Sequence, residues 1–237
     1  MMLAVELYCR TSFGRMHQGN PDIIELASRI DRTPGAVALK LSNLAALDSS
    51  LDRKGMSGFS KLDEEVWTEF NSAPLVFLDR VERMSSDQYI SPPAKSHQAL
   101  LGVREGEDVE RLVKVRRHQD FFRRALLVGY DGRCAVTGIR QPELLVASHI
   151  VPWAEDQALR LNPSNGILLN ALHDRAFDQH FITFTDDLAM VVAPTLQVSP
   201  EVRPFFEGRE LRLPNRFRPS PEILARHRDR FNEKWAA

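Results

Sequence analysis

The feature that most constrains this 237-residue chain is a histidine in a short apolar segment, followed by an Asn-Gly pair and a second histidine. His149 lies in a segment that we predict to form a strand over residues 144–151. Asn165 and Gly166 are a turn signal. His173 begins a segment whose spacing predicts a helix over residues 171–177. A strand, a loop and a helix in this order can bring two imidazoles to one metal ion and one phosphodiester.

Hydrolysis of a phosphodiester needs a base to deprotonate water and a positive charge to neutralise the phosphoryl oxygens. We predict His149 as the general base, because an imidazole titrates near neutral pH and the base is typically worth ~10²–10⁴ in rate. The alternative is a buried histidine bonded to a backbone carbonyl. We expect Asn165 to bond backbone groups across its own loop and so to lock the strand of His149 against the helix of His173.

We predict His173 as a ligand of a divalent metal ion, with oxygen ligands nearby. Asp174 and Asp178 are four residues apart and therefore share one face of the predicted helix. One imidazole with carboxylate or water oxygens suits a site that keeps positions open for phosphate, with Mg²⁺ or Mn²⁺ as the expected ion and other transition metals as alternatives. Spacing does not decide which aspartate takes part, and Asp178 could instead tether the following strand.

The charge distribution indicates a nucleic-acid partner, although the formal net charge is only −1. Residues 111–140 hold eight basic and two acidic side chains, directly before the His149 strand. Such a basic patch is typical of proteins that bind the phosphate backbone. We therefore expect DNA contacts from four arginines, with a solvated helix face as the alternative reading. These arginines are Arg116, Arg117, Arg123 and Arg124.

Residues 1–85 are predicted to form a helical domain. Asn20-Pro21 and Thr33-Pro34 each combine a capping residue with a proline at the first helical position. Two short helices joined by a tight turn resemble a helix-turn-helix, or a winged-helix-like unit, that would read DNA with Arg32, Lys40 and Asn43. The alternative is a plain helical hairpin inside a small bundle.

We expect a linker over residues 86–110 and a second domain over residues 111–237, which together give an α+β fold. Within the second domain the pattern predicts a helix, a short strand, a hairpin and a terminal helix. Their expected ranges are 109–128, 134–136, 181–185 with 189–192, and 222–235.

Composition excludes several classes of protein. An apolar fraction of 43% with 27% charged residues is ordinary for a globular protein. We find no apolar stretch of about 18 residues, so we expect no membrane span. The first residues lack the pattern of a signal peptide. Two distant cysteines, Cys9 and Cys134, argue against a disulfide scaffold and fit a reducing cytoplasm.

Several short motifs resemble those of the HNH endonucleases, most closely the restriction-associated branch. The motifs occur in the order of that family and lie within about residues 112–195. They are Tyr130-Asp-Gly-Arg-Cys-Ala-Val-Thr-Gly138, Ala147-Ser-His-Ile-Val-Pro-Trp153, Asn162-Pro-Ser-Asn-Gly-Ile-Leu-Leu169 and Leu172-His-Asp-Arg-Ala-Phe-Asp178. The resemblance implies a ββα-metal fold, with His149 as base, Asn165 as the loop-fixing residue and His173 as metal ligand. More weakly, the N-terminal segment resembles the helical region ahead of such domains, which implies a target-reading module.

Two positions depart from the family pattern. Many members carry an aspartate or another ligand immediately before the base, where this chain has Ser148, which could join the metal shell directly or through water. Many relatives also bind zinc through Cys-x-x-Cys pairs, whereas the corresponding stretch here has Cys134 and Thr137. One cysteine cannot form such a zinc site, so Cys134 is expected to be a small core residue.

The leading hypothesis is a metal-dependent endonuclease that hydrolyses double-stranded DNA. The alternative is a DNA-binding regulator with a degenerate nuclease site, for which Ser148 is the sign. A third hypothesis is a structural module that a metal ion stabilises. One ββα site cuts one strand, so a double-strand break would call for two sites related by symmetry, as in a homodimer.

Overall fold

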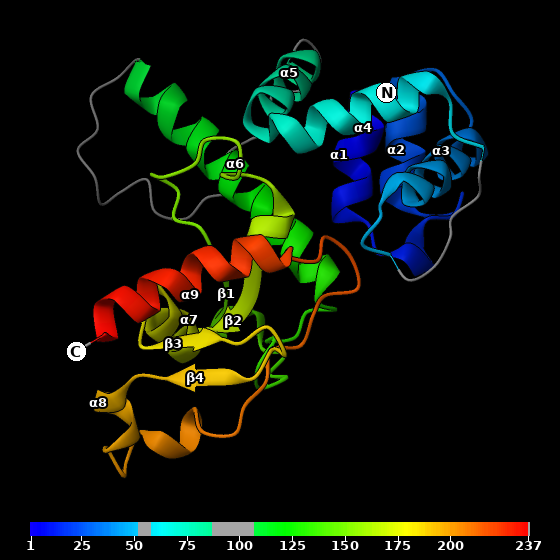
Figure 1. The fold of residues 1–237 in the computed structure, drawn as a ribbon. Coiled ribbons are helices and arrows are strands. Elements are labelled where there is room, and N and C mark those ends of the chain that lie inside the picture. The colour runs from blue at the N-terminus through cyan, green and yellow to red at the C-terminus, as the bar shows by residue number, and fades with distance from the viewer. Residues whose placement is uncertain (52–57, 87–106, 237) are drawn as a thin grey trace.

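The computed structural model describes residues 1–51, 58–86 and 107–236. A group of helices and a group containing two small sheets are joined by one long helix, α6 (Figure 1). The first group contains α1 (Met2–Arg10), α2 (Pro21–Arg29), α3 (Pro34–Leu47), α4 (Lys61–Ser72) and α5 (Pro74–Ser86), and α6 is Glu107–Gly129. The second group contains β1 (Leu145–His149), β2 (Gly166–Asn170), α7 (Ala171–Asp178), β3 (Ile182–Phe184), β4 (Met190–Val192), α8 (Pro194–Gln197) and α9 (Pro221–Trp235). The predicted α+β class is confirmed.

The two predicted helix starts in the N-terminal group are confirmed. The Asn20 side chain accepts a hydrogen bond from the backbone N–H of Asp22, and Thr33 accepts one from Ala36. Each cap satisfies a backbone donor that has no partner inside the helix. Among the described residues before residue 87 there is no β-strand, so residues 1–51 and 58–86 contain no wing.

Helix α6 packs against both groups of elements. It contacts α1 in the helical group and both strands of the first hairpin (Figure 1). Buried side chains form one continuous cluster, from Val5 on α1 through Phe122 and Leu126 on α6 to Leu168 on β2. The division at residue 111 therefore falls inside a helix shared by the two groups. Most of the expected linker, residues 87–106, lies outside the described residues.

The first hairpin pairs β1 with β2 in antiparallel register, with His149 opposite Gly166 and Leu145 opposite Asn170. All five residues of β2 are buried, because α6 covers one side and α7 packs nearby. The second hairpin pairs β3 with β4, as the pattern of residues 181–192 predicts. Helices α7 and α9 are likewise close to their expected positions.

The strand expected over residues 134–136 is wrong, because these residues form a turn. The backbone N–H of Gly138 donates to the carbonyl of Cys134 at 2.9 Å, and Gly138 adopts a φ of 74°, which glycine reaches without steric cost. Cys134 is fully buried and free, as expected of a core residue. Its sulfur lies 3.2 Å from the backbone nitrogen of Asn170.

Arg216 ties the C-terminal part of the chain to the first helix. Its guanidinium donates to the carbonyls of Tyr8 and Cys9 at 2.9 and 3.0 Å, at the C-terminal end of α1, where backbone carbonyls are open to donors from outside the helix. The same guanidinium lies over the rings of Tyr8 and Phe217, 4.5 and 5.1 Å from their centroids. The arginine is 3% exposed, so water cannot replace these contacts.

Among the described helices, none is long and apolar enough to cross a lipid bilayer.

Replacing Arg216 by alanine is expected to lower the free energy of unfolding by about 2–3 kcal/mol, through the loss of charged hydrogen bonds and ring contacts. Urea unfolding followed by circular dichroism measures the change. Arg116→Ala removes an exposed guanidinium instead and should leave the midpoint nearly unchanged. Equal midpoints for the two variants would contradict the structural role of Arg216.

Candidate active site

The imidazole of His149, at the end of β1, is held on three sides. The ring of Phe122 on α6 stacks on it at 4.1 Å with an interplanar angle of 5°. Trp153 meets it edge-on at 5.7 Å. Nε2 lies 2.9 Å from the backbone carbonyl of Arg160. Because a carbonyl can only accept, this contact places the proton on Nε2 and leaves the lone pair of a neutral ring on Nδ1.

The surroundings of His149 favour its neutral form. Burial lowers the pKa of the imidazole below its ordinary value of 6.5, and the Arg160 carbonyl and the charge of Asp178 oppose this only in part. A neutral imidazole at neutral pH can accept a proton, as a general base must. Asp178 acts on this pKa across the hairpin, so α7 and the end of β1 lie near each other.

Gly166 makes the approach of α6 to His149 possible. It is the residue opposite His149 in the hairpin. A Cβ atom at this position would lie 2.6 Å from Phe122 Cζ and 2.6 Å from a terminal carbon of Leu126. Only a residue without a side chain therefore allows the Phe122 ring to lie flat against the imidazole.

Asn165 closes the long loop between the two strands. Its side-chain oxygen accepts from the backbone N–H of Val151 at 2.9 Å, and its Nδ2 donates to the carbonyls of Val151 and Leu159 at 3.0 and 3.2 Å. The side chain is fully buried. These bonds join the two ends of the loop that follows His149, rather than joining β1 directly to α7.

A second set of contacts fixes the middle of this loop. Arg160 donates from Nε to the carbonyl of Trp153 at 2.8 Å, and its guanidinium lies 5.6 Å from the centre of the Trp153 ring. Helix α9 adds ion pairs from Arg226 to Asp156 at 3.0 Å and from Arg230 to Glu155. The Arg160 carbonyl, which orients His149, therefore belongs to a loop that is held by contacts within the loop and by ion pairs from α9.

Ser148, Asp174 and Asp178 gather beside His149. Burial raises the pKa of Asp174, the charge of Asp178 raises it further, and the nearby Ser148 hydroxyl partly opposes both. The Ser148 oxygen is buried and makes no hydrogen bond of regular geometry with a described residue. Two neighbouring carboxylates and a hydroxyl oxygen are the donor set that hard divalent cations prefer. A cation would offset the burial of the Asp174 carboxylate and its repulsion by Asp178, so the chemistry of this donor set suits a metal ion.

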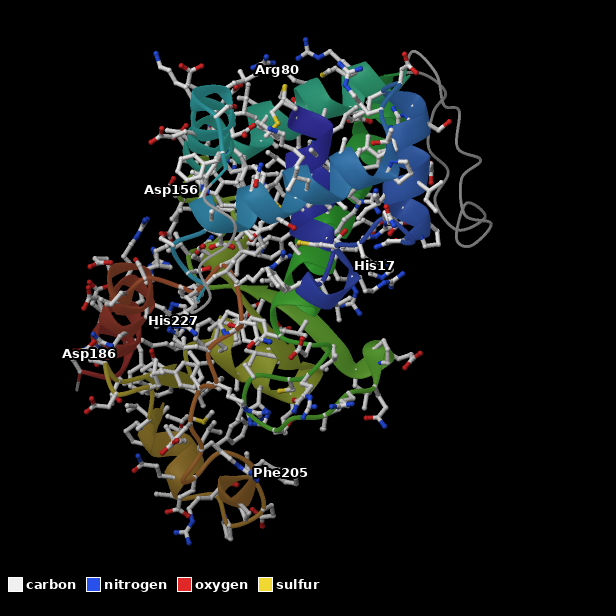
Figure 2. The ribbon with its side chains drawn as sticks, turned by 90° about the vertical axis from the view of Figure 1, so that its right-hand side faces the viewer. His17, Arg80, Asp156, Asp186, Phe205 and His227 are labelled. Carbon is white, nitrogen blue, oxygen red and sulfur yellow. The ribbon has the colours of Figure 1, made fainter. Side chains whose placement is uncertain are left out.

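The His173 ring contacts residues of β2 and of the segment after α8, and none of these contacts is shared with His149. The ring of His173 is 1% exposed and packs against Phe206. Nδ1 lies 3.0 Å from the Asn170 side-chain oxygen, and Nε2 lies 3.2 Å from the carbonyl of Phe205. Phe205 belongs to a segment after α8, at the end of the molecule opposite Arg80 on α5 (Figure 2). Both ring nitrogens thus face protein oxygens, and burial lowers the pKa of this imidazole as well.

The arginines of α6 differ in what they contact. Arg123 donates to the carbonyls of Leu145 and Pro142 at 2.6 and 2.7 Å and so fastens α6 to the start of β1. Arg117 forms an ion pair with Glu82 on α5. Arg116 and Arg124 are exposed on the helix surface. Of these four, Arg116, Arg117 and Arg124 are exposed, and Arg123 is partly buried.

The expected DNA-reading face of α3 is not formed as the sequence suggested. Asn43 is 7% exposed and donates to the carbonyl of Gly58 at 3.0 Å. Lys40 contacts both carboxylate oxygens of buried Asp63, at 2.8 and 2.9 Å. Both residues face α4 and its entry segment, because α4 covers the side of α3 that we expected to be outward. Arg32 is exposed and donates to the carbonyl of Asp31.

Sequence reasoning missed the residues that hold the site in place. Nothing in a single sequence connects Phe122 or Arg160 with His149, since both contacts are made by packing. His227 on α9 was also missed: it stacks on Phe177 at 3.6 Å and contacts the carbonyl of that residue and the Thr183 hydroxyl. Burial lowers its pKa to about 3, so it is a neutral residue that docks α9 on α7.

Comparison with known proteins identifies a domain within this part of the chain. A family model described as HNH endonuclease matches residues 134–185. The match includes β1, β2 and α7 and therefore contains His149, Asn165 and His173. A comparison with curated proteins found no match.

Replacing Gly166 by alanine is expected to displace Phe122 and Leu126, since a Cβ cannot fit at 2.6 Å from their carbons. We expect a loss of about 1–3 kcal/mol in unfolding free energy, measured by urea unfolding, because the overpacked ring must move. Gly14→Ala is the control, since a Cβ there meets no atom within 4 Å. A Gly166→Ala protein as stable as the control would contradict this close packing.

Proposed function

We propose that this protein is a metal-dependent endonuclease that hydrolyses phosphodiester bonds of double-stranded DNA, with His149 as the general base. The match of residues 134–185 to the HNH endonuclease model supports nuclease activity. The observation that carries the assignment of the base is the contact between His149 Nε2 and the Arg160 carbonyl. It leaves Nδ1 of a neutral ring to receive a proton.

In the proposed reaction, Nδ1 of His149 takes a proton from a water molecule as the water oxygen attacks phosphorus. A new P–O bond forms, the bond to the 3′ oxygen breaks, and that oxygen leaves with a proton from solvent. The imidazolium produced is stabilised by the Arg160 carbonyl, which accepts a hydrogen bond from Nε2. Phe122 and Trp153 keep the ring from rotating while the proton moves.

We propose that Asp174 and Asp178, with the Ser148 hydroxyl or a water bonded to it, hold a Mg²⁺ or Mn²⁺ ion. When bound, such an ion neutralises charge on the phosphoryl oxygens and on the leaving oxygen. We assign His173 a different role from the expected one. Its contacts with Asn170 and Phe205 make it an anchor between the start of α7 and the segment that follows α8.

For substrate binding, we propose that Arg116 and Arg124 contact the phosphate backbone near the site and that the helical group contributes to target selection, as in a restriction-type enzyme. Arg32 is the residue of that group whose exposure suits a DNA contact. A double-strand break would need a second copy of the site, and we propose a dimer formed on DNA as its source.

The second candidate is a DNA-binding regulator with an inactive nuclease site. The observation that favours it is Ser148, which places a hydroxyl where a charged ligand would hold a cation more strongly. Incubation of supercoiled plasmid with several divalent ions distinguishes the two. Nicking favours the endonuclease, and binding without nicking under every ion favours the regulator.

We expect His149→Ala to reduce plasmid cleavage in Mg²⁺ or Mn²⁺ by about 10²-fold or more, since it removes the base. DNA binding, measured by gel shift at low salt, should be retained because the backbone contacts come from arginines. His17→Ala is a matched control, because His17 is exposed in the helical group (Figure 2). Cleavage by His149→Ala at the rate of the control would show that His149 is not the base.

The pH dependence should reflect the lowered pKa of His149. A base works when deprotonated, so cleavage should be retained as pH falls through 6.5 and be lost only below that value. The acid limb of kcat/KM against pH reports this ionisation for the free enzyme. An acid limb centred above pH 6.5 in the parent protein would contradict the assignment.

A further inference from the structure

A second group of metal-ligating side chains lies between α5 and α6. Asp79 and Glu82 lie three residues apart on α5, and His118 faces them from α6. Each offers one ligand atom, and these atoms lie within 4.8 Å of one another. One ion can therefore contact all three without a change in the backbone.

The environment of these residues differs from that of an exposed acidic cluster. The His118 side chain is 7% exposed, and those of Asp79 and Glu82 are 20% and 23% exposed. His118 Nε2 lies 3.1 Å from Asp79 Oδ1. These three partly buried side chains, on two different helices, are already close together. Binding of an ion would therefore cost little side-chain conformational entropy.

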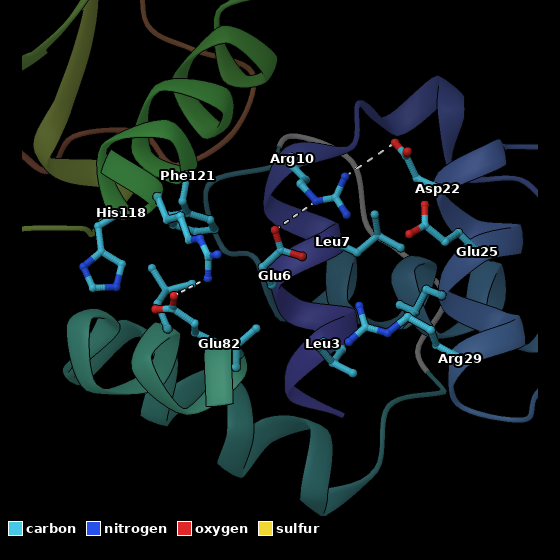
Figure 3. A pocket seen from close by; sticks show the side chains of 14 residues that line it. Leu3, Glu6, Leu7, Arg10, Asp22, Glu25, Arg29, Glu82, His118 and Phe121 are labelled. Carbon is cyan, nitrogen blue, oxygen red and sulfur yellow. Dashed lines mark hydrogen bonds and ion pairs between the residues drawn. The ribbon is translucent and has the colours of Figure 1, made fainter. Parts of the chain in front are cut away.

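Two of the three proposed ligands, His118 and Glu82, border a cavity. His118 and Glu82 line one edge of a cavity of about 240 Å³ between α1, α2, α5 and α6. Figure 3 shows their side chains near each other at this edge, with Phe121 beside them. The cavity can also hold a water molecule as a further ligand, as three-residue metal sites commonly do.

The charges allow a cation here, although Glu82 already pairs with Arg117. A carboxylate has two oxygens, so one can accept from Arg117 while the other binds a metal ion. Asp79 adds a second negative charge beside a histidine. One imidazole nitrogen with two carboxylates suits zinc or manganese better than magnesium, which prefers oxygen ligands alone.

We propose that Asp79, Glu82 and His118 bind a zinc-like divalent transition-metal ion that ties α5 to α6. Such an ion would also affect the candidate active site at His149, because α6 contributes residues to both sites. His118 lies one helical turn before Phe122, the residue that stacks on His149. An ion at His118 therefore fixes the helix close to the point where it positions the base.

The test is titration of the full-length protein with Co²⁺, followed by its visible absorption, and with Zn²⁺, followed by metal analysis after dialysis. His118→Gln should bind one equivalent less than the parent protein, and the affinity of Glu82→Gln should fall about tenfold or more. Arg117→Gln is the matched control: it breaks the same ion pair as Glu82→Gln but keeps all three ligands, so it should retain the ion.

Asp174→Asn separates this site from the proposed nuclease site, because it should leave the Co²⁺ signal that depends on His118 intact. Zn²⁺ should also raise the Tm of the parent and of Asp174→Asn, but raise that of His118→Gln less. Circular dichroism checks that each variant is folded, and Glu82→Gln provides a second ligand variant if His118→Gln does not fold. Equal stoichiometry and affinity in the parent and in the folded ligand variants would overturn the proposal, whether or not the protein cleaves DNA.

Discussion

The hydrogen bond from His149 Nε2 to the Arg160 carbonyl is the interaction on which the candidate site depends. It selects one of two tautomers and thereby decides which ring nitrogen can take a proton. A backbone carbonyl is a suitable partner because it cannot change its protonation state. Its position depends on the loop after β1, which Asn165 closes at its ends and the ion pairs of α9 hold from outside.

Helix α6 supports the other side of the same ring. The Phe122 ring can lie against His149 only because Gly166 leaves space, and Arg123 holds the helix to the carbonyls near the start of β1. The α6 arginines that the sequence predicted as DNA contacts therefore lie in two different environments. Arg123 is used within the protein, whereas Arg116 and Arg124 remain on the surface.

Sequence patterns predicted most of the elements, because capping residues, prolines and apolar spacing act over a few neighbouring residues. They also placed His149 in a strand and Asn165 in the loop that follows it, but they did not predict the strand β2 that begins at Gly166. They could not predict the surroundings of His173, since spacing defines a helix face but not the segment that covers it, here 32 residues further on at Phe205. The same limit explains Lys40 and Asn43, which lie on a face of α3 covered by α4. Residues 134–136 are too few for periodicity to distinguish a strand from a turn.

The supports of the hairpin come from outside the stretch that matches the HNH endonuclease model, residues 134–185. Phe122 precedes this stretch, while Phe205, Arg226 and His227 follow it. The packing of the matched residues is therefore completed by segments on both sides of them. A fragment cut at those boundaries would expose the apolar surface of β2 to water, and grafting it onto another scaffold would require helix α6 and the C-terminal segment to accompany it.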